Sequence, residues 1–370
     1  MIESLVPVTF DQDDPRERGR AHGELWRQEI RALASLRVEL CLGQPGVRDL
    51  AHLDALAASH LPVLAQTLPA LSAELLGIAE GADLSPARIV VLNHHMGLCG
   101  IAASSVSTTI PEGDGGTAMY IAGPAGPVLG QTWDTNASAA PFVRVIRVAP
   151  RGGDVEHVCL TLTGCLGVAG IGRTGVAVTV NGLATTDARI GLVGPAVLRT
   201  LIAAHDAGAA YARLGALPRS SGNHYMIADG AAFHGVETTG ELCVLTQLGP
   251  KAAHIHTNHC FDPVLRSREQ LARGSASHHR LDSATTLYLQ QRPRDVDGLW
   301  RMLGSHDGHP RSICSHLDLE RGDLAAPRTC ARVAFDLWSG CMRVAAGCSA
   351  DDRPQVITLG EFVSRRPPAA

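Results

Sequence analysis

The spacing of apolar residues changes near residue 113, and this change constrains the fold more than any other feature of the chain. Before it, apolar residues recur at helical spacing, as Leu25, Ile30, Leu33 and Leu36 do, and prolines mark helix starts or interruptions. After it, short β-branched runs such as VLGQTWD and VAVTVNGL alternate with glycine turns. A helical first part followed by mixed strands and helices predicts an α+β domain built from packed layers.

The 370-residue chain is long enough for one large domain or two modest ones. We expect residues 1–112 to be mainly helical and residues 113–370 to form the core of the fold. Within this core the sequence predicts a hairpin over 222–238 with an Asp-Gly turn and another over 328–347 with a Ser-Gly turn. It also predicts a helical segment over 194–217.

The overall composition excludes several classes of protein. Apolar residues make up 45% and charged residues 18%, as in a globular protein, and the formal net charge is −4. The chain has no basic stripe and only 4% aromatic residues, so we expect no nucleic-acid partner. No apolar run is long enough to span a bilayer, and the start, MIESLVPVTF, has no basic leader. We therefore expect no membrane partner and a cytoplasmic location.

Ten cysteines and a histidine-rich stretch raise the question of metal binding. No two cysteines have the two-residue gap of zinc knuckles and redox motifs, so we expect buried, reduced thiols. The stretch HIHTNH holds His254, His256 and His259, and the first two would share one face of a strand. No Asp or Glu lies near them in the sequence. We expect structural or pocket-lining histidines and no metal.

Six short stretches occur in an order that resembles a known family. They are RERGRAHGE, ELLGIAEGADLS, GDGGTAMYIAGPAGPVLGQTWD, GNHYMIADG, HTNHC and SICSHLD. Together they are similar to the acyltransferase and amidohydrolase group of N-terminal-nucleophile hydrolases, to which bile-salt and penicillin V hydrolases are more distantly related. The resemblance covers nearly the whole chain and implies an α+β fold, the αββα four-layer sandwich.

The resemblance points to one turn as the reactive centre. In that family a Gly-Cys-Thr turn precedes a GQNWDW-like strand, and the precursor cuts itself between the glycine and the cysteine. The freed cysteine is the nucleophile, and its α-amine, with an ordinary pKa of about 7.7–8.0, can serve as the general base. Here the turn is Gly115-Gly116-Thr117, and Gly116 stands where the family has cysteine, eighteen residues before Asp134. Since glycine has no side chain that could attack a carbonyl, we expect neither self-cleavage nor an acyl-enzyme at position 116.

Three explanations of this glycine stay open. The chain is an engineered variant that holds the precursor or traps a ligand, a natural member that kept the fold without its nucleophile, or a protein whose nucleophile has shifted to Thr117. The shift would move the cut by one residue and change the strand face that the side chain occupies. A native thiol, Cys99 or Cys165, is a further candidate, although neither has the small-residue cut site followed by threonine and a strand.

The resemblance also assigns roles to residues around position 116. Asp134 would orient the α-amine or the substrate, unless it only caps the turn that follows it. Asn258 would hold the oxyanion, which is worth about 3–4 kcal/mol in a transition state, or would satisfy a buried loop. Asn181 would be a second polar residue of the pocket, unless its Asn-Gly pair forms a hairpin turn. Arg328 is the nearest match to a basic residue of the acyltransferases, or a solvated arginine, and His256 is a candidate for substrate binding.

These assignments lead to two hypotheses of different classes. The first is an enzyme that transfers or hydrolyses the acyl group of a small N-acyl amide through the residue at position 116, here inactive and uncleaved. The second is a non-catalytic protein that keeps the acyl or peptide pocket. We expect no bound cofactor, and we allow for acyl-CoA as a co-substrate and for a homo-oligomeric assembly.

Overall fold

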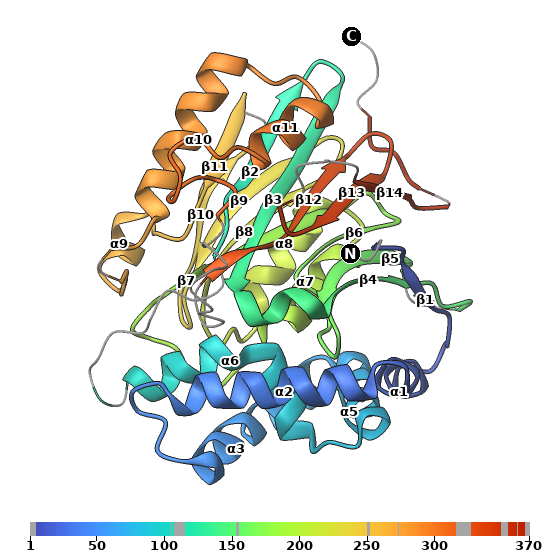
Figure 1. The fold of residues 1–370 in the computed structure, drawn as a ribbon. Helices are drawn as coiled ribbons and strands as arrows, with labels where there is room; N and C mark the ends of the chain where they lie inside the picture. Colours follow the sequence, from blue (N-terminus) through green and yellow to red (C-terminus); the bar gives the residue numbers. More distant parts are fainter. Residues whose placement is uncertain are drawn as a thin grey trace.

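The chain forms a block of helices joined to a pair of β-sheets (Figure 1). The computed structural model describes residues 5–104, 106, 115–152, 155–249, 252–272, 274–315, 327–348, 354–360 and 362–366. The first part begins with a short strand, β1 (Val8–Phe10). Helices follow it: α1 (Pro15–Leu25), α2 (Arg27–Leu42), α3 (Leu50–Ala58), α4 (His60–Thr67), α5 (Pro69–Ala82) and α6 (Pro86–Ser104).

Helices α1 and α5 cross closely because glycines line their contact. A Cβ atom built on Gly19 would lie 2.0 Å from the carbonyl oxygen of Glu74, and one on Gly77 would lie 2.1 Å from that of Arg16. Only glycine leaves room for main chains this close. The RERGRAHGE and ELLGIAEGADLS stretches therefore specify a helix crossing.

A buried charge cluster ties this crossing to the rest of the fold. Glu74 on α5 accepts a hydrogen bond of 3.1 Å from Arg18 on α1 and one of 2.9 Å from Arg199 on α7 (Gly194–Ile202). Burial opposes the ionised carboxylate, but the charges of Arg199 and Arg18 outweigh it and lower the pKa of Glu74 to about 2. The carboxylate thus stays charged and bridges helices from both parts of the chain.

Two sheets form the second part. The larger has the strand order β1-β4-β5-β6-β7-β8-β9-β10, and the smaller has the order β11-β2-β3-β12-β13-β14. The other strands of the larger sheet are β4 (Val143–Val148), β5 (His157–Leu162), β6 (Ala169–Gly172), β7 (Ala177–Leu183), β8 (Gly222–Ala228), β9 (Phe233–Thr238) and β10 (Cys243–Leu248). Those of the smaller sheet are β2 (Ala118–Gly123), β3 (Gly126–Asn136), β11 (Ala253–His256), β12 (Pro327–Asp336), β13 (Cys341–Ala346) and β14 (Gln355–Thr358).

The two sheets face each other and carry helices on their outer faces. Strands β2 and β3 of the smaller sheet pack against β7 of the larger one. Helices α7 and α8 (Ala207–Ala216) cover the larger sheet, and α10 (Ser277–Gln291) and α11 (Val296–Leu303) cover the smaller one. This arrangement confirms the predicted α+β fold with αββα layers. Two short elements, α9 (Pro263–Arg266) and the 3₁₀ helix η1 (Ala137–Phe142), complete it.

Most local expectations for the core are confirmed. Strands β8 and β9 form the hairpin predicted over 222–238, and β12 and β13 form the one predicted over 328–347. The helical segment over 194–217 is two helices, because the chain breaks after α7 and Asp206 caps α8 by accepting from the main-chain N–H of Ala209 at 2.8 Å.

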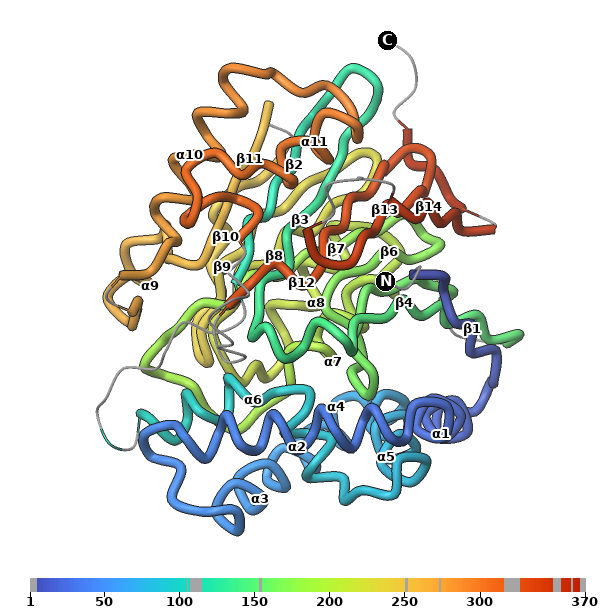
Figure 2. The backbone as a smooth tube through the Cα atoms, in the orientation of Figure 1, coloured from blue at the N-terminus to red at the C-terminus, as the bar shows by residue number. Residues whose placement is uncertain are grey.

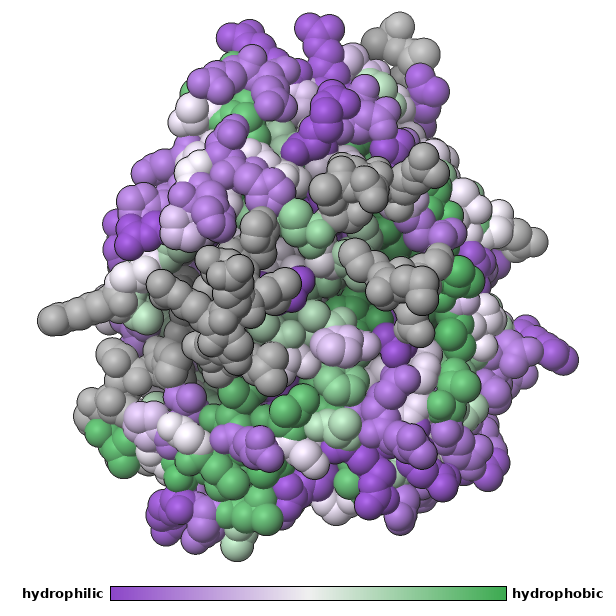
Figure 3. Space-filling model, viewed as in Figure 1, coloured by the Kyte–Doolittle hydropathy of each residue, from purple (hydrophilic) through white to green (hydrophobic). Residues whose placement is uncertain are grey.

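The helical part is connected to the sheets at its start as well. Strand β1 pairs in parallel with β4, so the first residues of the chain extend the larger sheet. The backbone trace shows the helices of the first part lying together along one side of the sheet pair (Figure 2). On the face seen in Figure 3, apolar residues gather mainly in the lower half, while hydrophilic residues dominate the top. None of the described helices is long and apolar enough to cross a membrane.

Candidate active site

The turn at residues 115–117 continues strand β2 alongside the end of β3. Gly115 donates its N–H to the carbonyl of Asp134 at 2.6 Å and accepts from the N–H of Asp134 at 3.2 Å. Thr117 donates its N–H to Thr132 Oγ1 at 3.0 Å and accepts from the N–H of Thr132 at 3.0 Å. Pairing on both sides fixes Gly116 at a buried position alongside β3.

Gly116 has a backbone conformation that other residues rarely adopt. Its φ is +143°, and a Cβ atom built there would lie 2.1 Å from the carbonyl oxygen of Thr132. A side chain at this position would therefore require the main chain of the turn to move. In its present shape, the turn does not accommodate the cysteine that the family carries.

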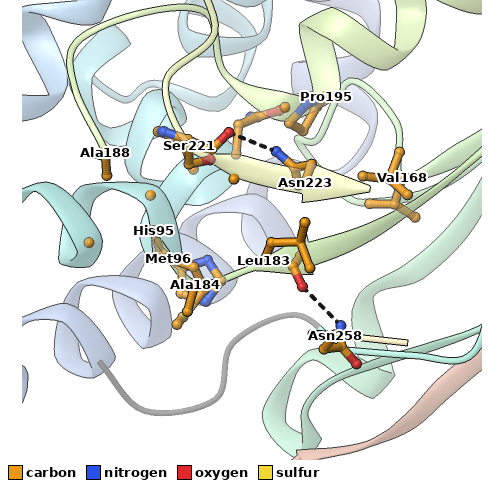
Figure 4. A pocket seen from close by; sticks show the side chains of 18 of the residues that line it. His95, Met96, Val168, Leu183, Ala184, Ala188, Pro195, Ser221, Asn223 and Asn258 are labelled. Carbon is orange, nitrogen blue, oxygen red and sulfur yellow. Dashed lines mark hydrogen bonds between the residues drawn. The ribbon is translucent and has the colours of Figure 1, made fainter. Parts of the chain in front are cut away.

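Two polar side chains hold the main chain of Gly116 from opposite sides. Its N–H donates to Asn258 Oδ1 at 3.2 Å, and its carbonyl accepts from Arg280 Nη1 at 2.6 Å. Arg280 Nη2 also donates to Asn258 Oδ1 at 2.7 Å, which closes a small network. Asn258 Nδ2 donates to the carbonyl of Gly182 at 3.1 Å (Figure 4). The structure thus places the predicted oxyanion residue in direct contact with position 116.

Asp134 lies on the other side of the turn. It is 3% exposed, and its Oδ1 accepts a hydrogen bond of 2.6 Å from Thr329 Oγ1 on β12. A Cβ atom on Gly115 would be 3.6 Å from the Cβ of Asp134. Asp134 therefore lies beside residue 115 of the turn, and its predicted role toward a group at position 116 stays a prediction.

The side-chain amide of Asn181 also lies beside position 116. It is fully buried in the middle of β7, where it pairs with His224, so the alternative of an Asn-Gly hairpin turn is wrong. Neither its Oδ1 nor its Nδ2 has a hydrogen-bond partner among the residues that the structure describes. Its Nδ2 lies 3.4 Å from the Cβ position of Gly116. Buried amides normally find partners, so this amide is an exception that lies directly beside position 116.

Two predicted substrate-binding residues lie elsewhere. Arg328 on β12 pairs with Thr135, and its Nη2 is 3.4 Å from the Cβ position of Gly347. His256 on β11 bonds Glu237 Oε1 at 2.8 Å through Nε2 and stacks on His224 at 3.5 Å. No acidic residue lies near this histidine in the sequence, but β9 brings Glu237 to it from a more distant segment.

A pocket adjoins the site. It has a volume of about 160 Å³ and lies between α6, the ends of β7 and β8, and α7 (Figure 4). Asn258 forms part of its wall, and Gly182, which Asn258 contacts, forms another part. Most of the wall is apolar, including Leu92, Met96, Leu162, Val168, Leu183 and Leu198. Arg328 and His256 are not among its described lining residues, so their roles in binding stay predictions.

Polar residues gather on one side of this pocket. Arg37, Asn93, His94 and His95 all line it. Burial lowers the pKa of His94 well below its usual value, and burial together with the charge of Arg37 does the same for His95. Both rings are therefore neutral at pH 7.

The cysteines are free, and most are buried, as predicted. Cys165 lines the pocket, whereas Cys99 is buried in the core beside Cys41. Away from the pocket, His306 Nε2 lies 3.0 Å from Cys348 Sγ, and with Cys314 these ligand-type atoms lie within 4.8 Å of one another. It is the one such group in the part of the chain described, and the histidines at 254–259 do not belong to it.

Sequence reasoning missed two residues of the site. Arg280, rather than Arg328, contacts position 116, although it comes from a helix whose SHHRLDS start has the composition of a solvated surface. Thr329 immediately follows Arg328, one residue from the position chosen from the sequence. The residue predicted from the sequence, Arg328, was therefore one position away from Thr329, the residue that contacts Asp134.

Comparison with known proteins supports the resemblance. No protein-family model matches the chain. The chain is 24% identical over 311 residues to the acyl-coenzyme A:6-aminopenicillanic-acid-acyltransferase 40 kDa form of Emericella nidulans, a match covering 82% of this chain and 83% of that protein. The sequence match confirms the similarity to the N-terminal-nucleophile acyltransferases.

Solved structures give weaker matches. Penicillin V acylase from Agrobacterium tumefaciens aligns with a TM-score of 0.43 and 13% identity, over 65% of this chain and 84% of that one. A mutant of conjugated bile acid hydrolase from Clostridium perfringens aligns with a TM-score of 0.41 and 10% identity, over 66% of this chain and 92% of that one.

Proposed function

We propose that this chain binds small N-acyl amides in a site arranged for acyl transfer or for hydrolysis of a linear amide. One observation carries the proposal: Asn258, which forms part of the wall of an apolar pocket, holds the main chain of Gly116 together with Arg280, and the amide of Asn181 lies beside the same residue. The similarity to an acyltransferase over most of the chain supports it.

With cysteine at position 116, the arrangement suits acyl transfer through a thioester. The sulfur would add to the amide carbonyl, and the C–N bond would break as the thiol proton passes through the α-amine to the leaving nitrogen. Asp134 would orient that α-amine, and the amides of Asn258 and Asn181 would face the carbonyl oxygen. Water or a second amine would then add to the thioester, break the C–S bond and return the proton to the sulfur. With acyl-CoA as the donor, the same sulfur would add to the thioester carbonyl, the C–S bond to CoA would break, and the CoA thiol would leave with the proton.

With glycine at position 116, the same site binds without cutting. The φ of +143° belongs to a turn whose main chain occupies the space next to Thr132 that a side chain would need. This observation also favours the second hypothesis, a protein that uses the pocket for binding alone. A cytoplasmic location and a homo-oligomeric assembly stay predictions.

Turnover by a restored nucleophile tests the proposal. The Gly116→Cys chain and a Gly116→Ala control are incubated with N-hexanoylglycine, and released glycine is measured; the control moves the turn in the same way but adds no thiol. We expect release by the cysteine variant only. If the folded cysteine variant releases nothing but the original chain binds the compound, the binding protein is the better account; if nothing binds, both accounts fail.

A further inference from the structure

Arg37 is a buried cation at the polar side of the pocket. It comes from α2, is 1% exposed, and lines the pocket together with His95 and Trp133. Figure 4 shows the neighbouring part of the wall, where His95 and Met96 lie beside Ala184. The acyl-transfer steps proposed above do not use the guanidinium of Arg37.

The protein uses only one end of the guanidinium. Nη1 donates to the ring of His95 and to Asn136 Oδ1 at 3.1 Å. Within the described part of the chain, Nε has no hydrogen-bond partner, and Nη2 has only a long contact of 3.5 Å with Thr135 Oγ1. The Nε–H and the Nη2–H groups form the side of the fork that binds a carboxylate through two parallel hydrogen bonds. That side is the one without a strong hydrogen bond among the described residues, although the Nε atom itself is buried.

The charge of Arg37 is also uncompensated. Its hydrogen-bond partners in the described residues are a neutral histidine, an amide and a hydroxyl, and none of them is anionic. The buried Arg18 and Arg199 differ in this respect because both contact the carboxylate of Glu74. A buried charge without a counter-ion is costly, so an anionic ligand group would gain a strong partner here.

The position of Arg37 indicates which part of a ligand carries the anion. Its contacts Thr135 and Asn136 directly follow Asp134, and two residues of strand span about 7 Å. In an N-acyl amino acid the carboxylate is two bonds beyond the amide nitrogen, so a carboxylate at Arg37 would leave the amide carbonyl near residue 116. A dry cavity of about 150 Å³ can hold benzene, so a pocket of about 160 Å³ suits an acyl group of about six carbons.

We propose that Arg37 recognises the carboxylate of an N-acyl amino acid through its Nε–H and Nη2–H groups. This inference rests on the proposed function and makes it more specific. Because glycine at position 116 prevents turnover, affinity for the unmodified chain can be measured at equilibrium.

A matched pair of ligands tests the inference without any mutation. N-Hexanoylglycine and N-hexanoylglycinamide differ in charge but share the acyl group and the amide bond, and their dissociation constants are measured by calorimetry at pH 7. We expect the carboxylate to bind at least tenfold more tightly. Equal affinities, or tighter binding of the glycinamide, would overturn the role of Arg37 and leave the proposed function standing; no binding of either would overturn both.

Variants of Arg37 then test whether this residue causes the difference in affinity between the two ligands. In Arg37→Met the preference for the carboxylate should disappear, and in Arg37→Lys, which keeps the charge but loses the fork, it should fall only partly. Arg332→Met is the control, because Arg332 is also buried but packs over the Trp300 ring at 4.7 Å and does not line the pocket. Circular dichroism checks that each variant is folded. A preference that persists in folded Arg37→Met, or disappears in folded Arg332→Met, contradicts the assignment.

Discussion

Replacing Gly116 by alanine should destabilise the chain far more than the same change at its neighbour Gly115. A residue with a side chain in a sparsely populated backbone region costs about 1–3 kcal/mol. The Cβ atom would also lie 2.1 Å from the carbonyl oxygen of Thr132, so the turn must shift, which disturbs its hydrogen bonds to Asn258 and Arg280. Loss of those hydrogen bonds adds about 1–3 kcal/mol to the decrease in the free energy of unfolding. We expect Gly116→Ala to lower the free energy of unfolding by about 2–5 kcal/mol.

Gly115→Ala is a close control for this change. A Cβ atom there would meet Asn258 Oδ1 at 3.4 Å, an ordinary contact, so we expect a change within about 1 kcal/mol. Urea unfolding followed by circular dichroism at pH 7 gives both values. Equal unfolding midpoints for the two variants would refute the claim that the turn has a shape reserved for glycine.

Three further expectations concern the scaffold of the site. Arg199 and Arg18 lower the pKa of Glu74 from 4.5 to about 2, so its ionised form contributes roughly 3 kcal/mol of stability, which is present above pH 4.5 and lost as the pH falls toward 2. Glu74→Gln should therefore weaken the fall of the free energy of unfolding between pH 4.5 and 2. An unchanged fall would argue against the cluster. Gly77→Ala should lower the thermal unfolding temperature far more than Gly43→Ala, whose Cβ would meet its nearest atom at 3.6 Å, and similar temperatures would refute the close helix crossing. Thr329→Val removes the hydroxyl that donates to Asp134, so it should cost about 1–3 kcal/mol in urea unfolding, and a neutral result would mean that Asp134 does not depend on it.

The fold was predictable from the sequence where local preference and tertiary packing agree. The two hairpins combine β-branched runs with Asp-Gly and Ser-Gly turns, and both pair as predicted. Asn181-Gly182 shows the opposite case, because the pair favours a turn by itself but lies within β7. Pairing with His224 and Asn223 of β8 along the strand overrides the local preference.

The site was predictable only in part for a similar reason. Gly116 and Asp134 lie in one quoted stretch, and the structure brings Asn258 to them as the resemblance implies. Arg280 could not be found this way, since it lies in the polar start of its helix, SHHRLDS, although it shares a buried face with Ala284 and Leu287. Glu237 on β9 and His256 on β11 form their hydrogen bond between strands of different sheets, and the sequence has no pattern that predicts this contact.

The mass of the Gly116→Cys chain tests the central claim most directly. If residue 116 occupies the nucleophile position of a self-cleaving turn, the purified variant should split into pieces of 115 and 255 residues, while the Gly116→Ala variant and the unmodified chain stay whole at 370. A folded cysteine variant that also stays whole would contradict the assignment of position 116.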